Sequence, residues 1–201
     1  MERTIIIVYL ENIRKSNFNI ESLLVYVELT FYCKGCDIIA KNEGKKFEED
    51  IKSSVPENCW IYRLRDNASS FANGTNTRFT SSNICDYILL DDITKTLFLM
   101  ECKSTNGTSI PLTMIRENQI EGLKDANKHN LIAGLLVNFR NDKNDTFFIL
   151  IDKYLEMMVS LNKKSFNIHD LELIGATRIE SEKKRTRFRY NINKMMEDLH
   201  L

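Results

Sequence analysis

The chain has 201 residues, of which 43% are hydrophobic and 28% charged, which is the composition of an ordinary globular domain with a proper core. Lys plus Arg equals Asp plus Glu at 28 each, so the zero net charge excludes a uniformly basic protein and confines any binding of polyanions to a local basic face. No apolar run approaches the length of a membrane span, so we expect no membrane association. The odd count of five cysteines, without an obvious signal peptide, indicates free thiols and a cytoplasmic protein.

The first half of the chain contains one clear helix and one clear strand. Residues 1–40 fit helix and strand equally well, so we treat them as an N-terminal extension of uncertain structure and 41–201 as the folded domain. Gly44–Ser54 is predicted to be an amphipathic helix that ends before Pro56. Cys59–Arg65 is predicted to be a strand, and residues 66–83 a long polar loop.

A β-hairpin is predicted next, with strands at residues 84–91 and 96–103 and a turn at 92–95. Further elements are then expected in the order polar turn Ser104–Ile110, helix Arg116–His129, strand Leu131–Arg140, strand Thr146–Ile151, helix Lys153–Leu161, basic strand 185–190 and closing helix Asn193–Leu199. This order favours a single α/β domain in which helices flank a central mixed β-sheet.

Three charged residues interrupt the apolar hairpin. Antiparallel pairing would bring Asp86 close to Glu101, and Lys103 shares a strand face with Glu101 because the two are two residues apart. Charged side chains that converge on a buried sheet lower the stability of the fold unless a partner such as a cation interacts with them. Carboxylate oxygens are ligands that Mg²⁺ prefers. The functional interpretation is a metal site beside a phosphate ester, and the alternative is a surface hairpin with an internal Glu–Lys ion pair.

Further motifs in the same order resemble a known superfamily. Glu48 lies in the predicted first helix, Ser104 and Thr105 follow Lys103, and the helix after the hairpin carries Gln119. Together they resemble the PD-(D/E)-x-K nucleases, and most closely the RecU-type Holliday junction resolvases. The resemblance spans residues 42–192 and is tightest over Phe98–Leu123.

This resemblance implies a restriction-endonuclease-like core and a Mg²⁺-dependent, structure-selective DNA endonuclease that resolves four-way junctions in recombination and repair, with Mn²⁺ as a substitute metal. Asp86 and Glu101 would be the principal metal ligands, Glu48 a third acidic ligand, and the backbone carbonyl of Cys102 a further one. Lys103 would contact the attacking water or the scissile phosphate, and Gln119 would orient water or a ligand. Paired nicks in a junction require two sites, so a homodimer is expected. The chain departs from the family in the stalk that projects before the catalytic Asp, where only residues 66–83 are available.

Several residues are predicted to contact DNA, either as cations for phosphates or, for Phe79, by stacking on an exposed base. They are Lys45, Lys46, Arg63, Arg65, Arg78, Phe79, Thr105, Arg116, Arg185, Arg187 and Arg189. For the basic run at 183–189, a charged edge strand that prevents aggregation is the alternative.

Two other functions remain open on sequence grounds. One is a restriction-like or repair nuclease that acts on other branched or duplex DNA, favoured by the short loop. The other is a nuclease-fold DNA-binding protein without turnover. Cys33 and Cys36 have the spacing of half a zinc site, but no second Cys/His pair stands at a matching distance, so incidental thiols are the favoured interpretation.

Overall fold

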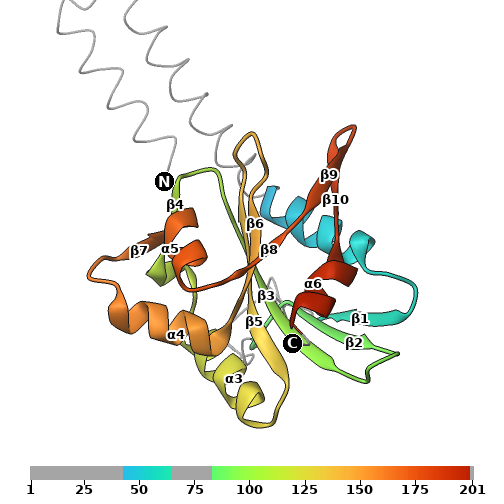
Figure 1. Ribbon diagram of the computed structural model, residues 1–201, viewed down its shortest axis with the longest axis horizontal. Helices are drawn as coiled ribbons and strands as arrows, with labels where there is room; N and C mark the ends of the chain where they lie inside the picture. The colour runs from blue at the N-terminus through green and yellow to red at the C-terminus, as the bar shows by residue number, and fades with distance from the viewer. Residues whose placement is uncertain (1–42, 65–82, 200–201) are drawn as a thin grey trace, which may run out of the picture. The chain divides into compact units, whose positions relative to one another are not determined.

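The computed structural model describes residues 43–64 and 83–199, which belong to one compact unit (Figure 1). The predictions for residues 1–40 and for most of the loop at 66–83 lie outside the described residues. Within the described part, no helix is both long and apolar enough to cross a membrane.

The strands are mostly short and come in groups separated by helices. Their bounds are β1 Cys59–Arg63, β2 Tyr87–Asp91, β3 Leu97–Thr105, β4 Ser109–Pro111, β5 Ile132–Phe139, β6 Thr146–Leu150, β7 Ser165–Asn167, β8 Thr177–Ile179, β9 Ser181–Lys184 and β10 Arg187–Tyr190. The helices are residues 43–54, the 3₁₀ turn η1 Leu112–Met114, α3 Glu117–Lys128, α4 Ile151–Ser160, α5 Ile168–Leu173 and α6 Ile192–Leu199.

The central sheet has six strands in the order β1-β2-β3-β5-β6-β8. The β3–β5 pair is parallel and the other pairs are antiparallel, so the predicted mixed sheet is confirmed. Helix α3 forms the crossover between the two parallel strands, as such a connection requires. The predicted hairpin is also confirmed, since β2 and β3 pair with Tyr87 opposite Met100.

Helices cover both faces of the sheet (Figure 1). On one face α3 and α4 bury Leu123 and Tyr154 against the odd-numbered residues of β5. On the other face the helix of residues 43–54 and α6 bury Phe47 and Met195 against Met100 and other residues of the central strands. Coverage of both faces explains why β5 reads as a continuous apolar run rather than an alternating one.

Three details differ from the sequence prediction. The stretch Ser104–Ile110 is not simply a turn, because the β3–β5 ladder extends to Thr105 and Ser109–Pro111 pairs with β7. Asp86 lies immediately before β2 rather than inside it. Arg185 lies in the β9–β10 turn with a positive φ of 53°, not on the strand face with Arg187.

The sequence also gave no sign of β7, α5, β8 and β9. Each of these elements has only three to six residues, too few to show a periodicity.

Gly134 in β5 provides a test of this packing. A Cβ there would lie 2.3 Å from the carbonyl oxygen of Ile149 on the neighbouring strand and 2.7 Å from the Phe148 ring. Gly134→Ala should therefore lower the free energy of unfolding by about 1–3 kcal/mol, measured by chemical denaturation. The matched control is Gly44→Ala, where a Cβ meets nothing within 4 Å in a helix, so stability should be unchanged or higher. Equal effects of the two changes would contradict the described β5–β6 packing.

Candidate active site

Asp86 and Glu101 lie side by side at the end of the β2–β3 ladder. Tyr87 is opposite Met100, so the next pair along the ladder is Asp86 and Glu101. The Asp86 backbone N–H donates to the Met100 carbonyl at 3.1 Å, and the Asp86 carboxylate accepts the Cys102 backbone N–H at 2.8 Å. This second bond fixes the Asp86 side chain beside the backbone of the Glu-x-Lys segment.

Glu101 is the most buried carboxylate of the site, with 2% of its surface exposed. Its Oε1 accepts from Lys103 Nζ at 2.5 Å and from Gln119 Nε2 at 2.6 Å. Of the predicted acidic and basic groups, Asp86, Glu101 and Lys103 thus lie together, and Gln119 reaches the same Glu101 carboxylate. The ion pair is mostly shielded from solvent, since only 15% of the Lys103 side chain is exposed.

Two hydrogen bonds, one to the oxygen and one from the nitrogen of its side-chain amide, orient Gln119. It lies in the first turn of α3, where its Oε1 accepts the backbone N–H of Arg116 at 3.0 Å while its Nε2 donates to Glu101. The first bond satisfies an amide that the helix itself leaves free, so the start of α3 and the position of Glu101 are coupled.

Burial, and after it the neighbouring Asp86 carboxylate, raise the pKa of Glu101 to about 7 against the opposing effects of Lys103 and Gln119. Two carboxylates held together in a poorly solvated place repel each other. In addition, Glu101 Oε2 is buried and has no hydrogen-bond partner among the described residues. A divalent cation would relieve both costs, so the donor set fits a hard metal ion.

Glu48 comes to this region from the helix of residues 43–54. The Tyr87 hydroxyl donates to its backbone carbonyl at 3.2 Å, which ties the helix to β2. The Glu48 carboxylate is held by Arg63, whose Nη2 lies 2.6 Å from Glu48 Oε2. Arg63, predicted to contact DNA, thus pairs with a predicted metal ligand instead. Tyr87 was missed, and its only sequence signal is its position next to Asp86.

Within residues 43–64 and 83–199, no three His, Cys, Asp or Glu side chains form a group that could hold a metal ion. The sheet itself supplies two carboxylates, and the third predicted ligand, Glu48, is engaged by Arg63. The metal roles of Asp86, Glu101, Glu48 and the Cys102 carbonyl therefore stay predictions.

Of the seven predicted DNA-contacting cations that the structure describes, four already have protein partners, Arg63 among them. Arg187 pairs with Asp50 and Glu49, Arg189 donates to the Ser53 carbonyl at 2.6 Å, and Lys46 pairs with Glu43. The first two therefore fasten the β9–β10 hairpin to the helix of residues 43–54. Their period-two spacing reflects this packing at least as well as it reflects DNA binding.

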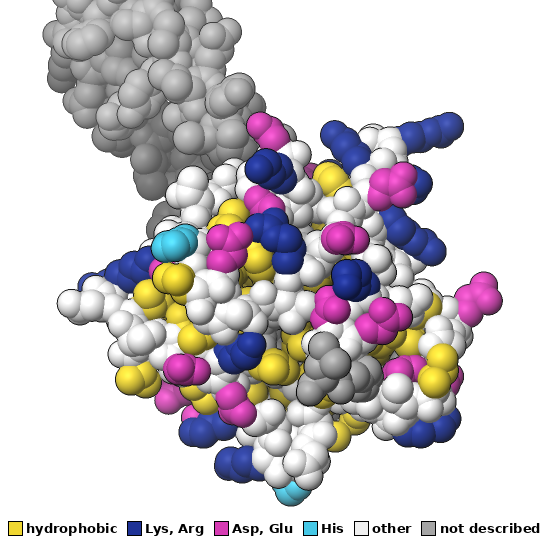
Figure 2. Space-filling model, in the orientation of Figure 1, with side chains coloured by type: hydrophobic (Ala, Val, Ile, Leu, Met, Phe, Trp, Pro, Cys, Tyr) yellow, Lys and Arg dark blue, Asp and Glu magenta, His cyan; other side chains and the backbone are white. Residues whose placement is uncertain are grey.

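The other predicted contacts are spread over the molecule. Lys45 is exposed on the helix of residues 43–54, Arg116 precedes α3, Thr105 ends β3 and Arg185 is at the hairpin tip. Arg65, Arg78 and Phe79 lie outside the described residues. Figure 2 shows Lys and Arg interspersed with Asp and Glu on the visible face, with cations gathered where the β9–β10 hairpin projects.

The geometry defines a class of protein. A mixed sheet that presents an aspartate beside a Glu-x-Lys segment, with a glutamine reaching in from the crossover helix, is the arrangement expected of a nuclease of the PD-(D/E)-x-K type. The family model RecU, Recombination protein U, matches residues 55–190, and the chain belongs to this family. Membership confirms the predicted RecU-type Holliday junction resolvase, a nuclease that hydrolyses DNA phosphodiester bonds. The match includes Asp86, Glu101, Lys103 and Gln119, whereas Glu48 precedes it.

The proteins that this chain is similar to include a prophage protein and an archaeal resolvase. The SPbeta prophage-derived uncharacterized protein YotM of Bacillus subtilis (strain 168) is 32% identical over 177 residues, covering 80% of this chain and 88% of YotM. The solved structure of Hjc, a Holliday junction resolvase from Archaeoglobus fulgidus, aligns with a TM-score of 0.44 and 15% identity, over 67% of this chain and 95% of Hjc. The second likeness is too distant to add to the argument.

The raised pKa of Glu101 predicts a specific pH dependence of stability. Between pH 4.5 and about 7 the folded protein retains a proton that the unfolded chain has lost, so the free energy of unfolding falls as pH rises through this window. Relative to Glu101→Gln, the metal-free protein should lose about 3 kcal/mol of stability across it, measured by denaturation in EDTA. Mg²⁺ should reduce the loss. A difference between the two proteins that stays constant from pH 4 to 8 would show that Glu101 is ionised normally.

Proposed function

We propose that this protein is a Mg²⁺-dependent, structure-selective endonuclease that cuts four-way DNA junctions as a homodimer. The observation that supports the metal dependence best is the Glu101 carboxylate. It is buried beside a second carboxylate, and one of its oxygens has no hydrogen-bond partner among the described residues. A protein has little reason to maintain such an arrangement unless a cation completes it.

In this proposal Asp86 and Glu101 hold the metal, with the Cys102 carbonyl and Glu48 as further ligands. When bound, the cation would favour ionisation of water and shield charge at the phosphorus. The Cys102 N–H keeps one Asp86 oxygen in a fixed place, at 2.8 Å, so the site is organised before the substrate arrives.

Lys103 and Gln119 act on the same Glu101 oxygen. The Lys103 ammonium, 2.5 Å from Glu101 Oε1, can retain that contact and donate a second N–H to the scissile phosphate or the attacking water, because an ammonium has three donors. Gln119 keeps Glu101 in position through its 2.6 Å bond. The burial of this cluster increases the strength of each charged contact.

The family and the charge distribution support the proposed substrate, and the need for paired nicks supports the proposed dimer. A chain of zero net charge whose cations alternate with acids has no broad field for duplex DNA. Recognition would therefore depend on the shape of the branched backbone and on a few phosphate contacts rather than on base edges. Two copies related by a twofold axis would place paired nicks symmetrically in the junction. The proposed location is the cytoplasm, where free thiols persist.

Asp86→Asn provides the test of metal dependence. The parent protein should cleave a synthetic immobile four-way junction in Mg²⁺ and lose this activity in EDTA. Asp86→Asn and Lys103→Ala should each reduce the cleavage rate by about 10²–10³-fold, since each removes a charge that acts on the reacting phosphate. Mg²⁺ should raise the melting temperature of the parent but not that of Asp86→Asn.

Asp92→Asn is the matched control, because Asp92 is exposed at the opposite end of the same hairpin. It should retain both cleavage and stabilisation by Mg²⁺. Cleavage of linear duplex and flap substrates, assayed in parallel, measures the preference for junctions. Analytical ultracentrifugation of the parent measures its oligomeric state, which should be a dimer. Full activity of Asp86→Asn, or activity of the parent in EDTA, would contradict the proposal.

A further inference from the structure

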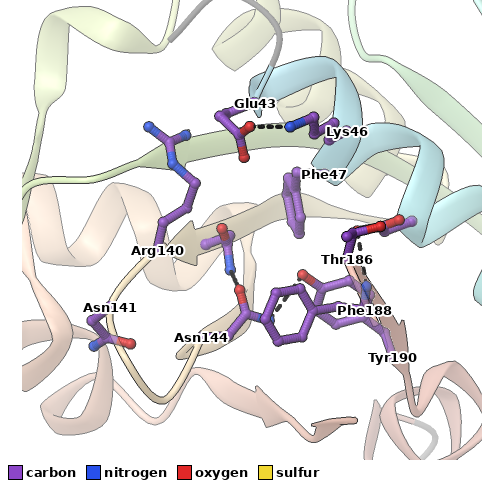
Figure 3. Close-up of a pocket in the computed structure, with 11 residues that line it drawn as sticks. Glu43, Lys46, Phe47, Arg140, Asn141, Asn144, Thr186, Phe188 and Tyr190 are labelled. Carbon is purple, nitrogen blue, oxygen red and sulfur yellow. Dashed lines mark hydrogen bonds and ion pairs between the residues drawn. The ribbon is translucent and has the colours of Figure 1, made fainter. Parts of the chain in front are cut away.

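A cavity of about 150 Å³ lies between the helix of residues 43–54, the β5–β6 turn and the β9–β10 hairpin (Figure 3). Phe47 and Tyr190 form part of its apolar wall, and Arg140 extends along its side toward Glu43 and Lys46. No role in the proposed mechanism involves this cavity, and Arg140 was not among the predicted DNA contacts.

Arg140 is fixed to the end of the catalytic strand. It follows β5 directly, and its backbone N–H donates to the Thr105 carbonyl of β3 at 2.8 Å. Its guanidinium Nη1 donates to Ser104 Oγ at 2.9 Å. Ser104 follows Lys103 immediately, and neighbouring side chains of a strand point to opposite faces. The guanidinium is therefore anchored at the same end of β3 as Lys103 but on the other face of the sheet.

A buried polar network supports this anchor. Ser104 Oγ donates to Asn138 Oδ1 at 3.0 Å, and Asn138 Nδ2 donates to both Asn144 Oδ1 and Thr146 Oγ1 at 2.9 Å. Asn138 is 1% exposed in a strand that is otherwise apolar. A fully satisfied buried network of this kind holds its members in one geometry, so the position of Arg140 is determined before any ligand binds.

The charge balance of the cavity leaves Arg140 available. The carboxylates that line it already have cations, since Glu43 pairs with Lys46 and Asp50 pairs with Arg187. Within residues 43–64 and 83–199, Arg140 makes no ion pair, and its bond to Ser104 uses one of five guanidinium N–H donors. The planar guanidinium, with N–H donors still available, can donate two parallel hydrogen bonds to two oxygens of one phosphate.

We infer that Arg140 binds a backbone phosphodiester of the DNA next to the scissile one, with Ser104 and Asn138 as positioning residues. This inference rests on the proposed nuclease function. Thr105, to which the Arg140 backbone is bonded, lies two residues or about 7 Å beyond Lys103 along β3. A DNA backbone that crosses this end of the sheet from the face of Lys103 to the face of Ser104 would bring a phosphate near the cut to Arg140.

Arg140→Gln tests the contact, with binding to a four-way junction measured by titration in Ca²⁺ over a range of salt. It should bind about tenfold more weakly, and the slope of log K against log salt should decrease by about 0.9, the effect of one lost phosphate contact. Lys128→Gln is the matched control, since Lys128 is an exposed cation at the end of α3 and β5 begins four residues later, at the opposite end of the ladder. It should leave affinity and slope unchanged.

Neutral methylphosphonate linkages, placed one at a time near the cut, locate the phosphate. One position within two nucleotides of the cut should weaken binding of the parent but cause no further loss for Arg140→Gln. Ser104→Ala should weaken binding about threefold without changing the salt slope, and Ser104→Thr should restore it, because only the hydroxyl anchor is lost. This pair also keeps the test decisive if Arg140→Gln folds poorly.

The outcomes separate the two proposals. A parent protein that cleaves the junction while Arg140→Gln matches Lys128→Gln in affinity and slope overturns this inference alone. A parent that neither binds nor cleaves the junction overturns the proposed function, and the inference with it. A methylphosphonate effect that adds fully to that of Arg140→Gln also overturns the inference.

Discussion

The antiparallel register of β2 and β3 brings two carboxylates together where the sheet is buried on both faces, and the organisation of the site follows from this arrangement. Asp86 and Glu101 repel each other, and burial adds to the cost, so the pKa of Glu101 rises to about 7. Each surrounding contact lowers that cost: the Cys102 N–H for Asp86, and Lys103 and Gln119 for Glu101. The cluster is stable as far as these partners, or a cation, can neutralise it.

The same arrangement explains the use of charge elsewhere in the molecule. Arg63, Arg187 and Arg189 are directed to the helix of residues 43–54, and they fasten β1 and the β9–β10 hairpin to it. Cations used for internal ion pairs contribute little to a field for DNA. In a chain without net charge, binding then depends on a few well-placed donors, and Arg140 at the end of β5 is one that no carboxylate of the described residues occupies.

The parallel pairing of β3 with β5 connects these two regions. It places Ser104 beside Asn138 and Thr105 beside Phe139, so the end of β3 is supported by β5, which Arg140 directly follows. The Glu-x-Lys segment and the proposed phosphate contact thus share one rigid element. A change in the buried amide network should therefore alter the proposed phosphate contact of Arg140 without moving Asp86, Glu101 or Lys103.

The sequence alone determined the hairpin, the mixed sheet and the convergence of Asp86 with Glu101, because strand alternation and antiparallel pairing are local rules. It also placed Gln119 on the following helix through family resemblance. Only the tertiary structure decided which ion pairs and hydrogen bonds the charged side chains form. The pairing of Arg187 with Asp50 joins residues 137 positions apart, and Arg140 reaches Ser104 through the β3–β5 register. Contacts between distant segments depend on how whole elements pack, and no periodicity in the chain encodes that packing.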